Sequence, residues 1–493
     1  ATLHLGRSLV AVVSYHLKGD AMTALSHETL LAMTRVADPL ADRTIAAIVG
    51  PWSDAPGAMK PGLARLATAT RLMTQWRSNA SLTDWQPADA SVDASVVSAL
   101  RDYLNEGRQL PAWTDAPQVA RAEAVFMREG PLACTLLFCA SLPECYVPPQ
   151  LAEVLHIAGQ LEANTEHRIR QTAAMVFPVM LKGGLTHADG CGVAQVLKVR
   201  LIHATIRHLI LHGEPGVGSG LIPSSTGTER ATGGHAALHE ALMAHGWDAP
   251  QRGLPCNQLE LAYTLLTFHF VFLRGMRTMG LGLAKADEDA FLHAWNVVGH
   301  ILGVQDGLMA SHYEEAAVLF DRMRAVGCAQ HAPPDVRPGL GMALVGAMAR
   351  SIRLPVIKEI PVPLTQWLIG ADASRAIGIA DATRWPTRWL FTLGRITTGT
   401  IDSAVRLVLP QFSISRMLTR VISYHMLSRF LLDQTRPLGL PEQVLNPLCD
   451  AVAQWHHEPR GPRWLNRVED ALTVSGHWVA APRKVPHDPS RAN

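Results

Sequence analysis

The sequence lacks several patterns that would assign it at once to a class of protein. Only 17% of its 493 residues are charged, and 44 Lys and Arg nearly balance 42 Asp and Glu. No long basic stretch is present, so nucleic acid is not an expected partner. The longest strongly apolar run, residues 261–273, is too short and too polar to span a bilayer, so we expect no transmembrane segment.

The N-terminus and the cysteines give few localisation signals. The first residues do not form an intact secretory signal, so a secreted or periplasmic location after signal removal and a cytoplasmic location both stay open. The seven scattered cysteines contain no C-x-x-C pair, which excludes a zinc ribbon or thioredoxin-type site. The C-x-x-C-H motif is also absent, so any haem would be held non-covalently. We expect mostly buried, reduced thiols.

Helical periodicity dominates what is present, and it predicts an all-α protein. Clusters of Pro and Gly mark the connections, and residues 213–234, rich in Gly, Ser and Thr, predict a loop. We divide the chain into an N-terminal helical region (1–91), a central region (92–350), and a C-terminal helical region with a tail (351–493). A single continuous domain is the alternative.

Residues 196–211 predict a buried helix with a histidine in its apolar stripe. His203 shares this stripe with valines and isoleucines, and Arg200 and Arg207 lie one turn to either side of it. A buried imidazole needs a partner. Haem iron is one such partner, and the two arginines would then meet the haem propionates. A hydrogen-bonded core histidine is the alternative.

A second helix is predicted over residues 165–180, with a kink or an end near Pro178. Arg168, Gln171 and Thr172 fall on one of its faces together with Met175. These polar groups beside apolar neighbours suit the lining of an oxygen-binding pocket. A solvated stripe is the competing interpretation.

Two more helices are predicted downstream. Residues 261–274 form a core helix that starts after Asn257 and Glu260, and residues 288–304 form a helix with an acidic first turn. His293 and His300 lie two turns apart on the latter helix. They are either a metal pair or, as we favour, hydrogen-bonded histidines.

Two weaker patterns are set aside. His235 and His239 have zinc-compatible spacing but no evident third ligand, and a helix start after residue 234 explains them equally well. The glycine-rich residues 213–220 lack the Lys-Ser/Thr of a phosphate-binding loop. No nucleophile-elbow motif is present around residues 225–229, so a serine hydrolase is unsupported.

Four motifs in one order resemble a known family. They are R-x-x-Q-T at residues 168–172, V-R-L-I-H-x-x-x-R at 199–207, G-x-P-x-N-Q at 253–258, and F-L-H-x-W-x-V-V-G-H-x-L-G-V at 291–304. Together they resemble the latex clearing protein (rubber oxygenase) family and its MpaB-like relatives. The likeness extends loosely from residue 111 to about residue 378.

The resemblance implies a globin-like helical fold, with additional N- and C-terminal helices, around one haem b. It places the axial iron ligand at His203 and the distal-side arginine and threonine at Arg168 and Thr172. The catalytic carboxylate corresponds to Glu153, with Glu166 as a second candidate. Where latex clearing proteins have a lysine between the arginine and the threonine, this sequence has Gln171.

The function expected from this resemblance is a haem b-dependent oxygenase that uses dioxygen. Its substrate would be an apolar unsaturated small molecule or polymer that is isoprenoid or polyisoprene-like. The expected reaction is oxidative cleavage of a carbon–carbon double bond. The alternatives are a haem hydroxylase or peroxidase-like enzyme, and a non-catalytic haem sensor or carrier. A purely structural helical protein ranks last. The sequence does not give the oligomeric state.

Overall fold

The part of the chain that the structure describes is helical and contains no strand. In this computed structural model it comprises residues 25–53, 59–159, 165–213, 234–330, 334–352 and 358–406, with Val421 and Ser423. The predicted all-α fold is therefore confirmed. The predicted loop, except for its two ends, and the C-terminal tail lie outside these residues. Six of the seven cysteines lie within them, and none of the six forms a disulfide.

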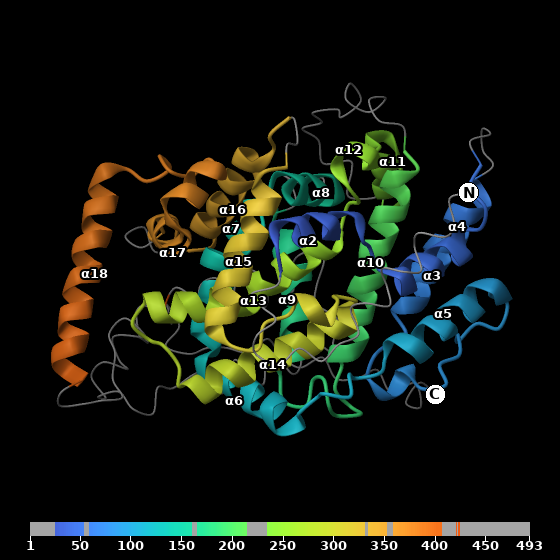
Figure 1. Cartoon of the computed structure of the whole chain (residues 1–493), viewed down its shortest axis with the longest axis horizontal. Coiled ribbons are helices and arrows are strands. Elements are labelled where there is room, and N and C mark those ends of the chain that lie inside the picture. The colour runs from blue at the N-terminus through green and yellow to red at the C-terminus, as the bar shows by residue number, and fades with distance from the viewer. Residues whose placement is uncertain are drawn as a thin grey trace, which may run out of the picture.

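Among the N-terminal helices, α3, α4 and α5 gather at one side of the molecule, whereas α2 lies near the centre of the view in contact with α15 (Figure 1). α3 contacts α4, α5 and α10. Asp38 starts α3, because its carboxylate accepts a hydrogen bond from the backbone N–H of Ala41, and Pro39 follows at the first helical position. These elements are α2 (His27–Ala32), the 3-10 turn η2 (Met33–Arg35), α3 (Pro39–Val49), α4 (Lys60–Met73), the 3-10 turn η3 (Ala80–Leu82) and α5 (Ala94–Gly107).

One long irregular helix follows. α6 (Ala116–Leu136) continues into the π-helical turn η4 (Leu137–Ser141) and then α7 (Leu142–Glu144). Among the described residues, this stretch alone is long and apolar enough to cross a membrane. However, 89% of its apolar window is buried inside the molecule, as expected of a core helix.

The predicted central helices are present. The helices predicted over 165–180, 196–211, 261–274 and 288–304 correspond to α9, α10, α13 and α14, and α9 continues through Pro178. α13 is buried around most of its circumference. The elements here are α8 (Pro149–Gly159), α9 (Thr165–Met180), α10 (Gly192–Leu211), α11 (Gly234–His245), α12 (Ala249–Arg252), α13 (Gln258–Thr278), α14 (Lys285–Leu302), the 3-10 turn η6 (Asp306–Leu308) and α15 (Tyr313–Cys328).

The last described helices are α16 (Arg337–Ser351), α17 (Pro361–Ala376) and α18 (Trp385–Arg406), and α18 stands at the margin of the molecule (Figure 1). One hydrophobic cluster runs from Leu30 to Ile379. The cluster includes residues on both sides of the two predicted region boundaries, near residues 91 and 350. The helices of the site therefore pack on a hydrophobic core that all three predicted regions share.

Candidate cofactor and catalytic site

His203 lies in the middle of α10, on the helix that contacts α3, α9, α11 and α14. Its Nδ1 is buried and has no hydrogen-bond partner among the described residues. Burial lowers the pKa of the imidazole to about 4, the charge of Arg207 adds to this, and Asp38 opposes it. His203 is therefore neutral at pH 7, the form in which histidine binds metals. A buried ring nitrogen without a partner fits an axial haem ligand.

Arg200 and Arg207 have partners within the protein. Arg200 binds Asp38 through two contacts, Nε–Oδ2 at 2.5 Å and Nη2–Oδ1 at 2.7 Å. Arg207, whose side chain is only 2% exposed, binds Asp42 Oδ1 and donates to the carbonyl oxygen of Cys256 at 2.7 Å. The predicted pairing with haem propionates is thus not supported by this geometry. Both arginines instead attach α10 to α3.

The face of α9 that was predicted to line an oxygen pocket is only partly described. α9 packs along α10, and Thr172 is half-buried. The side chains of Arg168, Gln171 and Glu166 lie outside the described residues. One turn beyond Thr172, Val176 and Phe177 line a small cavity of about 20 Å³. Aromatic rings dominate the rest of its lining: Phe126, Phe268, Phe272, Phe291 and Trp295.

Glu153 lies on α8, 3% exposed, in a compact charged cluster. Its carboxylate accepts hydrogen bonds from His245 Nε2 at 2.8 Å and from both terminal nitrogens of Arg252. Burial raises the pKa of Glu153, but the hydrogen bonds and charges of His245 and Arg252 outweigh burial and leave the pKa below its ordinary value. Arg252 also lies 3.7 Å from the ring centre of Trp247. Glu153 is therefore held ionised at neutral pH.

His293 and His300 do not form a metal pair. The backbone N–H of Asp115 donates to His293 Nε2 at 2.9 Å, and His300 Nδ1 donates to Asp306 at 2.8 Å. The hydrogen-bonded alternative is thus correct. Within the residues that the structure describes, no group of three or more His, Cys, Asp or Glu is arranged to hold a metal ion. The side chain of His235, half of the other candidate pair, is not among them.

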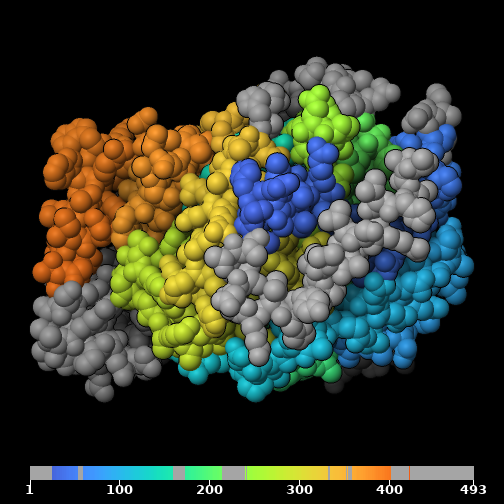
Figure 2. Space-filling view, in the orientation of Figure 1, coloured from blue at the N-terminus to red at the C-terminus, as the bar shows by residue number. Residues whose placement is uncertain are grey.

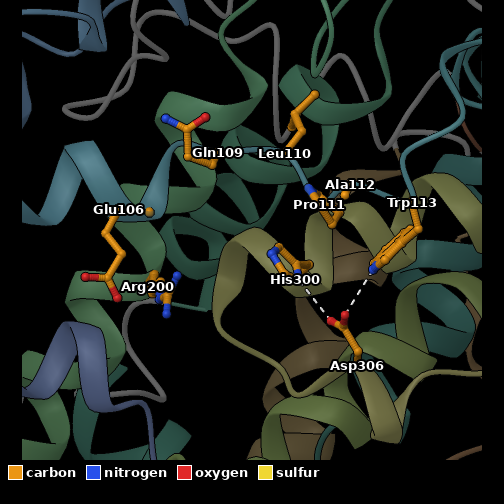
Figure 3. A pocket seen from close by; sticks show the side chains of 10 residues that line it. Glu106, Gln109, Leu110, Pro111, Ala112, Trp113, Arg200, His300 and Asp306 are labelled. Atoms are coloured by element: carbon orange, nitrogen blue, oxygen red, sulfur yellow. Dashed lines mark hydrogen bonds and ion pairs between the residues drawn. The ribbon is translucent and has the colours of Figure 1, made fainter. Parts of the chain in front are cut away.

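The side chain of Asp306 lines a polar cavity of about 320 Å³ at the protein surface. Figure 3 shows His300 and Trp113 both directed at its carboxylate, with Arg200 and Glu106 on the opposite wall. The cavity therefore lies on the side of Arg200 that faces the surface. Its polar walls do not suit an apolar substrate.

Comparison with known families decides the class of protein. A family model described as the catalytic domain of ER-bound oxygenase mpaB/B'/rubber oxygenase matches residues 135–401, more than half of the chain. The chain belongs to the MpaB/rubber oxygenase family. The predicted resemblance is confirmed, and the chain is an oxygenase of this family.

Individual relatives agree with this assignment. The rubber oxygenase of Streptomyces sp. (strain K30) is 24% identical over 336 residues, which cover 64% of this chain and 72% of that protein. The structure of latex clearing protein LCP in the closed state aligns with a TM-score of 0.57 at 18% identity, covering 83% of this chain and 95% of that one. At this identity the structural likeness shows the shared fold alone.

Two buried groups in the MpaB/rubber oxygenase region were missed by sequence reasoning. Burial lowers the pKa of His269, in the middle of α13, to about 3, and its Nδ1 has no partner among the described residues. Burial also raises the pKa of Glu260 to about 7, against the opposing effect of backbone hydrogen bonds from Asn257 and Cys256. The signal for His269 was a polar residue inside the most apolar run of the sequence.

Proposed function

We propose that this oxygenase binds one haem b, whose iron His203 would hold, and acts with dioxygen on an apolar unsaturated substrate. The observation that carries the proposal is the half-buried, neutral imidazole of His203, whose buried Nδ1 has no partner among the described residues, inside the region that matches the family's catalytic domain. When bound, haem b supplies the iron chemistry that activates dioxygen.

The chain's own residues then bind and orient the reactants. Arg168 and Thr172, one turn apart on α9, would orient oxygen by hydrogen bonding, and Glu153 would accept a proton from the substrate. His245 and Arg252 hold this carboxylate ionised and fix its orientation on α8. The aromatic side chains beside Val176 and Phe177 make the surroundings apolar, as an apolar substrate would require.

We infer that the substrate is isoprenoid or polyisoprene-like and that the reaction cleaves a carbon–carbon double bond. The relative from Streptomyces, named a rubber oxygenase, supports this substrate class. Product analysis by mass spectrometry tests the reaction, because cleavage gives shortened carbonyl compounds. Products that gain oxygen at full chain length would favour the hydroxylase alternative instead.

A visible spectrum tests the cofactor. The purified protein should show a Soret band, and His203→Ala should lose most of the haem. His293→Ala and His300→Ala serve as matched controls, since both imidazoles are hydrogen-bonded elsewhere. Full haem retention by the His203 variant would refute the assignment, and absence of turnover in a haem-loaded protein would favour a sensor or carrier.

A further inference from the structure

One helix presents an apolar face that no other described element covers. On α18, Trp385, Trp389 and Leu393 are 75%, 69% and 61% exposed, and Leu390 and Ile396 are similarly exposed. Trp385, Trp389, Leu393 and Ile396 follow one another at intervals of four, four and three residues, so they lie on one side of the helix. We call these five residues the α18 apolar face.

The opposite side of α18 is its attachment to the protein. Phe391 packs against Trp367 of α17 with ring centres 6.2 Å apart, and Arg395 lies 5.0 Å from the ring centre of the same tryptophan. Arg388 donates to the carbonyl oxygen of Ala380 at 2.9 Å. Figures 1 and 2 show the helix along one margin of the molecule. The α18 apolar face therefore points away from the core.

Arginines outnumber carboxylates around this helix. Residues 384–400 contain three arginines, Arg384, Arg388 and Arg395, and no carboxylate. All three arginines are exposed. Two of them, with Arg375 and Asp381, also line a cavity of about 400 Å³ between α17 and α18, and Glu359 accepts a hydrogen bond from Thr387 of α18. Guanidinium groups beside exposed tryptophans are the combination that recognises phosphate headgroups at a membrane surface.

The area of the face argues against a dimer interface. With about 150–250 Å² for each fully exposed aromatic, the five side chains offer roughly 600 Å². A stable dimer usually buries about 800 Å² on each partner. Tryptophan is also the side chain most typical of the water–membrane boundary. We propose that α18 docks the enzyme on the surface of a bilayer containing anionic phospholipid, with the α18 apolar face inserted among the headgroups and Arg384, next to Trp385, on the phosphates.

Vesicle co-sedimentation of the full-length protein tests this proposal without reference to haem or turnover. The probes are vesicles of phosphatidylcholine with a quarter phosphatidylglycerol, and vesicles of phosphatidylcholine alone. We expect binding to the anionic vesicles to be stronger by on the order of 10- to 100-fold, and to weaken in 0.5 M salt. Trp385→Ser/Trp389→Ser should weaken binding by at least about tenfold. Met342→Ser, at an exposed apolar residue of α16, should leave binding unchanged.

Three outcomes would overturn the proposal. The first is equal vesicle binding by the double variant and the wild type. The second is a wild-type dimer in sedimentation velocity that the double variant converts to a monomer, because the face would then join two copies of the chain. The third is a clear loss of thermal stability in the double variant, because the face would then be covered by the chain itself.

Discussion

Arg200 and Asp38 form a two-point ion pair that joins the middle of α10 to the start of α3. The Asp38 side chain is 3% exposed and that of Arg200 is 11% exposed, and Arg200 also donates to the carbonyl oxygen of Ile301 at the end of α14. Gly303 closes over the pair in a left-handed conformation with φ of 91°. A Cβ there would lie 2.5 Å from Asp38 Oδ2, so the pair is enclosed by backbone that only glycine allows.

Removing one partner of this pair should destabilise the protein strongly. Arg200→Ala leaves the buried Asp38 carboxylate without its counter-charge, and we expect the free energy of unfolding to fall by about 3–5 kcal/mol. Arg43→Ala, which removes an exposed ion pair with Glu106, should cost less than about 1 kcal/mol. Urea denaturation measures both. Similar losses of unfolding free energy in the two variants would contradict a structural role for Arg200. If Arg200→Ala instead lost haem while its unfolding free energy stayed unchanged, Arg200 would be assigned to the haem propionates.

Glu260 should make stability depend on pH between about 4 and 7. The unfolded carboxyl ionises near pH 4.3, whereas burial raises the pKa in the folded protein to about 7. As pH rises through this window the unfolded state loses its proton first, so the folded state loses roughly 3 kcal/mol of relative stability. Glu260→Gln cannot ionise, so the stability of the wild type relative to this variant should fall across the window, whereas the lowered pKa values of His203 and His269 act in the opposite direction and affect both proteins alike. Glu28→Gln, at an exposed position, should keep the wild-type curve, and an unchanged curve for Glu260→Gln would exclude a raised pKa.

Glu153→Gln tests the proposed base. An amide cannot accept a substrate proton, so we expect kcat to fall by about 10²–10⁴-fold with the haem content unchanged. His245→Gln should have a smaller effect and should move the acid limb of the pH–rate profile upward, because His245 helps to keep the pKa of Glu153 low. Wild-type turnover in Glu153→Gln would transfer the role to another carboxylate, and Glu166 is the next candidate.

Gln171 should not bind the iron of a haem held by His203. A glutamine amide nitrogen has no basic lone pair, whereas a buried lysine can lose its proton and bind iron. The ferric protein should give a high-spin electron paramagnetic resonance signal that becomes low-spin on addition of imidazole. Gln171→Lys should be low-spin before any addition. A wild-type spectrum that already shows two nitrogen ligands would refute this prediction.

Local sequence patterns predicted the helices around the site well. The apolar spacing of residues 196–211 and the acidic first turn before residue 291 correspond to α10 and α14 within a few residues. Partners far apart in the chain could not be predicted in this way. Asp38 and Asp42 lie about 160 residues before the arginines that they bind. No local period encodes such a pairing, so propionates seemed the nearest anions for Arg200 and Arg207.

Burial was the second property that the sequence left undefined. Glu260 was correctly expected near a helix start, where Asn257 Oδ1 accepts a hydrogen bond from its backbone N–H at 3.0 Å. Its raised pKa, however, comes from the packing around the first turn of α13, which depends on distant segments. The same holds for Glu153, because the two residues that keep it ionised lie on α11 and α12.

The π-helical turn η4 changes the angular phase of the helix that contains it. It closes i to i+5 hydrogen bonds, so it accommodates one residue more than an α-helical turn, and one residue corresponds to about 100° of rotation. Before the turn, α6 packs against α14; at the turn and beyond it, η4 and α7 pack against α17. This one stretch of helix therefore packs against α14 along its first part and against α17 along its last part. Because the turn absorbs one extra residue, deleting one residue between 137 and 141 would restore a regular helix and leave the later side chains near their present orientation, whereas a deletion elsewhere in α6 would rotate them by about 100°.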